Sequence, residues 1–216
     1  MALREDAASQ FAYTLDRYAA FLVELLDAGY EFVGFEGEPG LDPGEIALRH
    51  DVDLSLERAL AMARVEADLG VRSTYCPLPT ASVYNLLAPE NRSLLRELTG
   101  LGHDVGLHFN VRRHWEGRPP ESALAAQITR EREHLSRVVE RPVGIVSFHR
   151  PPDWVLDESF EGFEHAYQPE YFTAVDYISD SNQKWRDAPP LEGDLPEAAQ
   201  ILVHPGLWGE TDDPLD

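Results

Sequence analysis

The chain has 216 residues, 43% of them hydrophobic, which is enough to bury the core of one α/β domain spanning residues 1–216. Its 39 acidic and 18 basic residues give a net charge of −21, which opposes binding to nucleic acid or anionic lipid and does not favour an anionic nucleotide substrate. A membrane span needs about 20 apolar residues in a row, and the chain has no such run and no signal-peptide pattern. We therefore expect a cytoplasmic protein, and its single cysteine, Cys76, excludes an internal disulfide.

Helix and strand patterns alternate along the chain. Apolar residues at helical spacing predict an N-terminal helix over residues 8–29, ended by Gly29. A helix capped by Ser55 is expected over 54–70, and further helices over 89–102 and 121–140. Strands are expected over residues 45–53, 71–76, 103–108, 143–149, 175–181 and 198–205. This alternation predicts a parallel sheet or a barrel, and it leaves the oligomeric state open.

Polar side chains end most of the expected strands. Asp51 and Asp53 close the first strand, and because side chains alternate along a strand, both carboxylates face one side while His50 faces the other. Two such carboxylates repel each other unless a cation or a shared proton lies between them. The carboxyl ends of parallel strands meet at one rim, so we expect the polar ends of the other strands to lie nearby. These are His108, His149 with Arg150, Asp180 and His204.

A pair of histidines with one carboxylate is a common ligand set for zinc or another divalent metal. A second carboxylate can then take a proton from water that the metal activates, which gives Asp51 and Asp53 different functions. Either aspartate could instead cap the helix that begins near Ser55 without any catalytic function.

Four segments, ALRHDVDLS, LGHDVGLHFN, SFHRPP and LVHP, resemble in order and spacing the motifs of the polysaccharide deacetylases, carbohydrate esterase family 4. The resemblance covers residues 45–208 and is strongest to a divergent branch that has Asp-x-Asp in place of Asp-Asp. It implies a distorted (β/α) barrel of about seven parallel strands, here with an N-terminal helix in addition. It also implies a metal-dependent hydrolase that removes N-acetyl groups from amino sugars.

The resemblance also implies roles for individual residues. Asp51 would be the catalytic base, Asp53 the metal-binding aspartate and His108 the first metal-binding histidine. Arg150 would orient the base, and His204 would act as the general acid.

The chain departs from the family pattern at Arg112, where the family has its second metal-binding histidine. Either His114 or His149 could replace it, and we favour His149 because the end of a strand supports a ligand more rigidly than a loop does. The expected ligands are therefore Asp53, His108 and His149, with zinc as the expected metal.

The segment SDSNQKWR contains Asp180 and Trp185, which could form one wall of a sugar site or could cap and anchor a surface loop. Further aromatic walls could come from Trp115, Trp154 and Trp208. The expected substrate is a small amino sugar or sugar precursor. Two alternatives are a hydrolase of a non-sugar C–N bond and a barrel that has lost catalysis and serves as a binding module, as the arginine at position 112 would allow.

Overall fold

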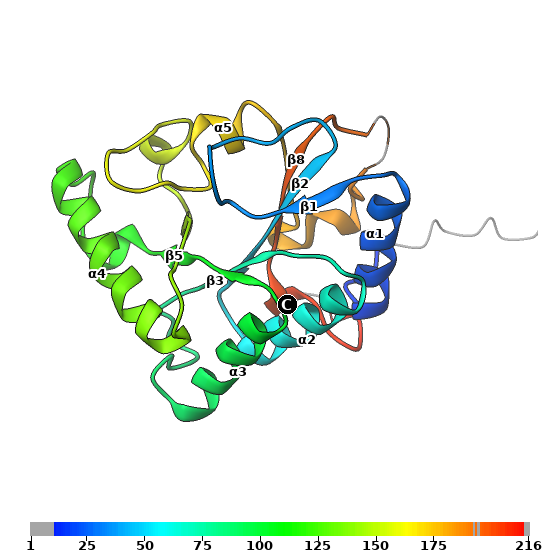
Figure 1. Ribbon diagram of the computed structural model, residues 1–216, viewed down its shortest axis with the longest axis horizontal. Coiled ribbons are helices and arrows are strands. Elements are labelled where there is room, and N and C mark those ends of the chain that lie inside the picture. Colours follow the sequence, from blue (N-terminus) through cyan, green and yellow to red (C-terminus); the bar gives the residue numbers. More distant parts are fainter. Residues whose placement is uncertain (1–10, 192, 194, 214–216) are drawn as a thin grey trace, which may run out of the picture.

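Parallel strands form the centre of the protein, and helices lie around them, in the computed structural model (Figure 1). The structure describes residues 11–191, 193 and 195–213. The strands are β1 (Glu31–Val33), β2 (Glu45–Val52), β3 (Thr74–Pro77), β4 (Asp104–Val105), β5 (Leu107–Phe109), β6 (Val146–Phe148), β7 (Asp176–Ser179) and β8 (Ala199–Val203). The helices are α1 (Leu15–Asp27), α2 (Leu56–Asp68), α3 (Pro89–Gly100), α4 (Glu121–Val139) and the short α5 (Pro169–Phe172). The expected parallel α/β class is therefore confirmed.

The first helix starts later than its apolar pattern predicted. Thr14 is its N-cap, because the Thr14 hydroxyl accepts a hydrogen bond from the amide of Arg17. Phe11 and Tyr13 precede the helix and are buried in the core beneath it. Residues 8–10 of the predicted helix lie outside the described residues. The second helix begins as expected, since the Ser55 hydroxyl accepts a hydrogen bond from the amide three residues later.

The larger sheet has the strand order β4-β3-β2-β8-β7, and β1 pairs with the first half of β2. The strand expected over residues 103–108 is split at Gly106, where the chain leaves β3 and pairs with β6 instead. A Cβ atom at Gly106 would lie 2.6 Å from the Cys76 sulfur and 2.8 Å from the Ile145 carbonyl oxygen. Only glycine allows this close approach, so Gly106 is what permits the change of partner.

In the part of the chain that the structure describes, no ladder joins β6 to β7, so the strands of the expected distorted barrel do not form a continuous ring. Residues 164–166 fill the opening, where the Val146 amide donates to the Glu164 carbonyl and the Ala166 amide donates to the Val146 carbonyl. From β8, the Gln200 amide donates to the carbonyls of Ala166 and Tyr171 at 2.8 and 2.6 Å. Backbone hydrogen bonds to β6 and side-chain hydrogen bonds from Gln200 on β8 thus hold residues 164–166 and Tyr171 across the opening.

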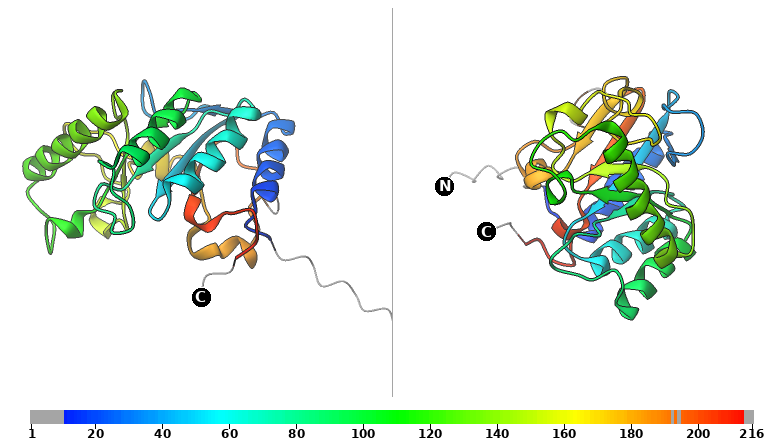
Figure 2. Two further views of the ribbon diagram at one scale, coloured as in Figure 1. Left: turned by 90° about the horizontal axis from the view of Figure 1, so that it is seen from below. Right: turned by 90° about the vertical axis from the view of Figure 1, so that its left-hand side faces the viewer.

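Three clusters of buried apolar residues stabilise this arrangement, and the two largest contain most of them. One lies between α1 and the larger sheet and contains Trp185 and Trp208, and the other lies among α2, α3, α4 and the strands. The left-hand view of Figure 2 shows α1 and α4 at opposite ends of the long axis. None of the described helices is both long enough and apolar enough to cross a membrane.

Candidate active site

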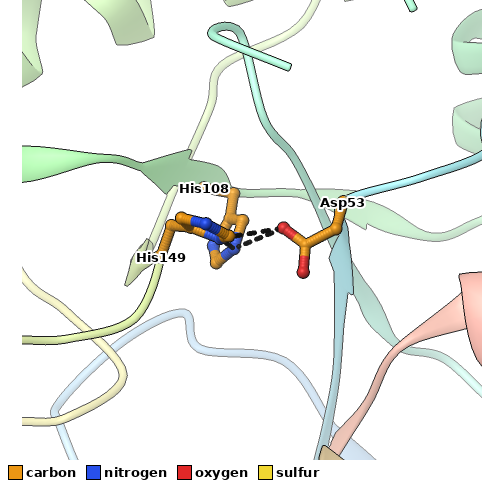
Figure 3. Close-up of side chains that lie close together, drawn as sticks. All are labelled: Asp53, His108 and His149. Carbon is orange, nitrogen blue, oxygen red and sulfur yellow. Dashed lines mark hydrogen bonds and ion pairs between the residues drawn. The ribbon is translucent and has the colours of Figure 1, made fainter. Parts of the chain in front are cut away.

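A cavity of about 950 Å³ opens at the carboxyl ends of the strands. Asp53 follows β2, His108 belongs to β5 and His149 follows β6 (Figure 3). All three line this cavity, and one donor atom from each lies within 4.8 Å of the other two.

The separations of these donors fit a single bound cation. Asp53 Oδ1 lies 3.2 Å from His108 Nε2 and 2.9 Å from His149 Nδ1, and the two ring nitrogens are 3.1 Å apart. Donors that each bind one ion at about 2.0–2.2 Å, with angles of about 90–109° between them, lie about 2.8–3.6 Å from one another. Asp53 Oδ1 is also buried without a hydrogen-bond donor in the described structure. The donor set therefore suits zinc or a related divalent metal.

His108 is held so that Nε2 points toward the other two donors. Its Nδ1 lies 3.2 Å from the Ser147 carbonyl oxygen and 3.2 Å from the Ser147 hydroxyl, on the strand that pairs with β5. Since a carbonyl can only accept, it favours the tautomer with hydrogen on Nδ1 and a free lone pair on Nε2. Burial alone would raise the pKa of Asp53, but the close approach and charge of His108 and His149 outweigh burial and lower that pKa. Asp53 is therefore a carboxylate, the form that binds metals.

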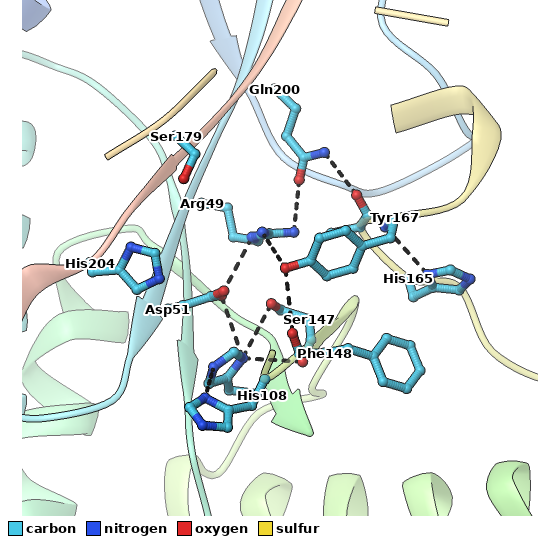
Figure 4. Close-up of polar contacts among 12 residues, drawn as sticks. Arg49, Asp51, His108, Ser147, Phe148, His165, Tyr167, Ser179, Gln200 and His204 are labelled. Carbon is cyan, nitrogen blue, oxygen red and sulfur yellow. Dashed lines mark hydrogen bonds and ion pairs between the residues drawn. The ribbon is translucent and has the colours of Figure 1, made fainter. Parts of the chain in front are cut away.

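Asp51 lies beside the three donors, is 2% exposed and pairs with the buried Arg49, for which the sequence motifs predicted no role. Asp51 Oδ1 is 3.4 Å from Arg49 Nε and 3.6 Å from His108 Nδ1 (Figure 4). Burial would raise the pKa of Asp51, but the charges of Arg49, His108 and His204 lower it. The side chain is thus a carboxylate without a bound proton.

The structure gives Arg49 the contact that the family resemblance implied for Arg150. Arg49 is fully buried, and its guanidinium donates to Gln200 at 2.9 Å, to the Tyr167 hydroxyl at 3.1 Å and to the Tyr177 hydroxyl at 3.2 Å. Arg150 is exposed on the turn after β6 and has no ion pair with Asp51. Strand alternation explains why Arg49 and not Arg150 contacts Asp51, because residues 49, 51 and 53 face the same side of the chain at β2.

His204 follows β8 at the opposite side of the cavity and is held by Asp180, which follows β7. Its Nδ1 lies 2.6 Å from Asp180 Oδ1, and its backbone amide donates to the same carboxylate. Trp208 Nε1 donates to Asp180 Oδ2 at 2.8 Å. Asp180 is fully buried and does not line the cavity, so it positions His204 and does not form the sugar-site wall that was one of its two expected roles.

Asp180 also fixes the charge of His204. Burial lowers the pKa of His204, but the hydrogen bond and charge of Asp180, with smaller contributions from Asp51 and Asp53, raise it to about 9. His204 is therefore protonated at neutral pH and can donate a proton into the cavity.

His114, the alternative third ligand, lies away from the cavity. Its Nε2 is 2.7 Å from Glu131 Oε1 on α4, and its ring stacks on Phe109. Arg112 is exposed and does not line the cavity. The structure thus brings His149, and not His114, beside Asp53 and His108.

Trp185 does not contribute a wall to the cavity, because it is buried beneath α1 in the aromatic core. Trp208 is in the same core, and neither Trp115 nor Trp154 lines the cavity. The aromatic residues that do line it are Phe148, Tyr167, Phe172 and Tyr177.

His50 faces away from the site, as strand alternation predicted. Its Nε2 lies 2.7 Å from Glu66 on α2, and Tyr18 on α1 donates to the same carboxylate. His165 is fully buried, and its Nε2 lies 2.9 Å from the Glu158 carbonyl oxygen while its Nδ1 accepts from the Tyr167 amide.

No protein-family profile and no curated protein matches the chain. Among solved structures, it is similar to a carbohydrate esterase family 4 pseudoenzyme from Bacillus anthracis at 12% identity and a TM-score of 0.48, over 78% of this chain and 57% of that one. It is similar to a family 4 carbohydrate esterase from Streptomyces lividans at 17% identity and a TM-score of 0.44, over 74% of this chain and 78% of that one. A peptidoglycan deacetylase from Bacillus subtilis gives 14% identity and a TM-score of 0.47, over 78% and 77% of the two chains.

The chain spans less than two thirds of the length of the pseudoenzyme. Solved structures to which this chain is similar thus include carbohydrate esterase family 4 proteins, the family whose motifs its sequence resembles.

Proposed function

We propose that the protein is a metal-dependent hydrolase that removes an N-acetyl or related acyl group from an amino sugar or sugar precursor. One observation carries the proposal: Asp53, His108 and His149 hold three donors about one point, in a cavity that also contains the carboxylate of Asp51 and the imidazole of His204. A ligand set, a base and an acid in one cavity suit hydrolysis of an amide.

Asp53, His108 and His149 would hold the metal, with zinc as the favoured ion because two imidazoles and one carboxylate form a common catalytic zinc set. When bound, such an ion supplies a Lewis acid that polarises an amide carbonyl and increases the acidity of an attacking water. Ser147 fixes the tautomer of His108 that leaves Nε2 free.

Asp51 takes the proton from the attacking water. Its burial removes competing solvent, and Arg49 keeps it ionised and in place. His204 then donates a proton to the nitrogen of the leaving amine, because Asp180 keeps its ring protonated and oriented. In this proposal Arg49 and Asp180 are positioning residues, whereas Asp51 and His204 are catalytic.

The rest of the cavity suits a sugar ring. Phe172 and Tyr177 supply aromatic faces, and Asn110, Ser179 and Ser181 supply hydrogen-bonding groups that sugar hydroxyls require. A domain spanning residues 1–216 and a cytoplasmic location stay predictions. A substrate with a non-sugar C–N bond is the alternative, and the following experiment distinguishes the two by which substrates the protein hydrolyses.

The test combines zinc titration of the metal-free protein with two hydrolysis assays: acetate release from a panel of N-acetylated sugars, and ring opening of a panel of cyclic amides. The wild type is expected to bind one zinc and to release acetate only when zinc is present. Asp53→Ala and His108→Ala should each lose zinc and turnover while keeping a folded circular dichroism spectrum. His134→Ala, at an exposed histidine on α4, is the matched control and should keep both. Zinc binding with no hydrolysis of any substrate would favour the binding module.

A further inference from the structure

Basic residues outnumber acidic ones in the cavity lining, whereas acidic residues outnumber basic ones in the whole chain. The whole sequence has 39 acidic and 18 basic residues. The cavity lining has two acidic residues, Asp51 and Asp53, and three basic ones, Arg113, Arg150 and Lys184. The two aspartates belong to the catalytic site, so the outer part of the cavity carries only positive formal charges.

The three basic side chains come from three separate loops. Arg113 ends the 3₁₀ turn Val111–Arg113 after β5, Arg150 follows β6, and Lys184 lies in the 3₁₀ segment Ser181–Arg186 after β7. Loops at the carboxyl ends of parallel strands converge on one opening, so residues far apart in sequence reach the same ligand. Lys184 is the single lysine of the chain.

None of these three side chains has an ion-pair partner among the described residues, although the surface is rich in acid. Other exposed arginines do have partners: Arg64 lies 2.5 Å from Glu97, and Arg96 lies 2.7 Å from Glu140. The three cations of the cavity are therefore available to an external anion.

The backbone that presents two of these cations is in an uncommon conformation. Arg150 has a φ of 46°, and Asn182, two residues before Lys184, has a φ of 57°. Non-glycine residues rarely adopt this left-handed conformation, which costs free energy and is retained mainly where the surrounding structure or a function requires it. The turn at Arg150 directly follows His149, so the same bend that orients the histidine presents the arginine to the cavity.

We infer that Arg113, Arg150 and Lys184 bind an oxyanion of the substrate, and that the substrate is an acetamido sugar carrying a phosphate or a carboxylate. This inference rests on the proposed function for the acetamido part only. Arginine forks pair with both kinds of oxyanion, and a cleft lined by one sign of charge attracts the opposite charge even on a protein of opposite net charge. The net charge of −21 is thus no guide to this substrate, contrary to the expectation from composition.

The first test measures anion binding without catalysis. Inorganic pyrophosphate is titrated calorimetrically into the protein at low salt, with and without added zinc. Arg113→Gln, Arg150→Gln and Lys184→Gln should each weaken binding about tenfold, the size expected for loss of one charge-assisted hydrogen bond. Arg112→Gln is the matched control, because Arg112 adjoins Arg113 on the same turn but lies outside the cavity lining, and it should bind normally. Absence of binding, or equal binding by all variants, would overturn the inference.

The second test measures kcat/KM for acetate release from N-acetylglucosamine, its 1-phosphate and N-acetylmuramic acid. The wild type should prefer one of the two anionic substrates, and which one identifies the oxyanion. Each of the three variants should reduce the ratio of anionic to neutral kcat/KM, and Arg112→Gln should preserve it. Hydrolysis of neutral sugar without any anionic preference would overturn this inference alone. Pyrophosphate binding that depends on the three cations, without acetate release from any sugar, would overturn the proposed function alone.

Discussion

Asp180 offers the sharpest test of how the protein supplies a proton to the leaving group. Replacing it by asparagine keeps the shape of the side chain and an oxygen that can accept from His204, but it removes the negative charge. The hydrogen bond and charge of Asp180 are the main causes that raise the pKa of His204 from 6.5 to about 9. In Asp180→Asn the pKa of His204 should therefore fall toward its ordinary value.

The size of the effect follows from the two pKa values of His204. With a pKa of about 9, roughly 90% of His204 is protonated at about pH 8; with 6.5, about 3% is, so about thirtyfold less of the acid is available. Activity that requires a protonated His204 is present below its pKa and lost as pH rises through it. The alkaline limb of kcat should thus lie near pH 9 in the wild type and move to lower pH, by up to about 2.5 units, in Asp180→Asn.

The assay is kcat for acetate release across pH, together with an NMR titration of the His204 ring. Asp176→Asn is the matched control, because Asp176 is exposed at the start of β7. This substitution should leave the alkaline limb of the kcat pH profile unchanged. An alkaline limb that stays near pH 9 in Asp180→Asn, while the NMR pKa of His204 falls, would refute the role of His204 as general acid. An unchanged NMR pKa would refute the role of Asp180.

Three further outcomes are expected. His149→Ala should abolish stoichiometric zinc binding and His114→Ala should keep it, as measured by calorimetry; the reverse would move the third ligand to the loop. Arg49→Gln should raise the pKa of Asp51, which would move the acid limb of the pH profile of kcat/KM to higher pH. The same variant should lose about 3–5 kcal/mol of stability in urea unfolding, because the buried Asp51 carboxylate loses its partner. Burial lowers the pKa of His165 to about 4 in the folded protein. Below pH 6.5 the unfolded chain therefore binds a proton at this histidine that the folded protein does not, and up to about 3 kcal/mol of folding stability should be lost by pH 4. His165→Gln should remove that slope, and an identical slope in this variant would contradict the assignment.

Strand periodicity predicted part of the site from sequence. It placed Asp51 and Asp53 on one face and His50 on the other, and the contacts of His50 with Glu66 agree. The same periodicity places Arg49, two residues before Asp51, on the face of the two aspartates. The family resemblance implied Arg150 as the partner of Asp51, but the structure has Arg49 in that position.

Other features depend on contacts between distant segments, which local patterns do not reveal. The pair of His204 and Asp180 joins the ends of β8 and β7 across 24 residues of sequence. Trp185 follows a polar stretch, yet tertiary packing buries it beneath α1. Short β1 gave no strand signal, because its three residues form a strand only by pairing with β2.

The central claim is that Asp53 holds the metal and Asp51 acts as the base. The most direct measurement is the single-turnover rate of acetate release by zinc-loaded Asp51→Asn protein, with zinc content determined on the same sample. We expect full zinc occupancy and a rate at least about a hundredfold below the wild type, because an amide cannot accept the proton. A zinc-replete Asp51→Asn protein with the wild-type rate would contradict this claim. Loss of zinc from Asp51→Asn, with zinc retained in Asp53→Asn, would show that the two aspartates have exchanged functions.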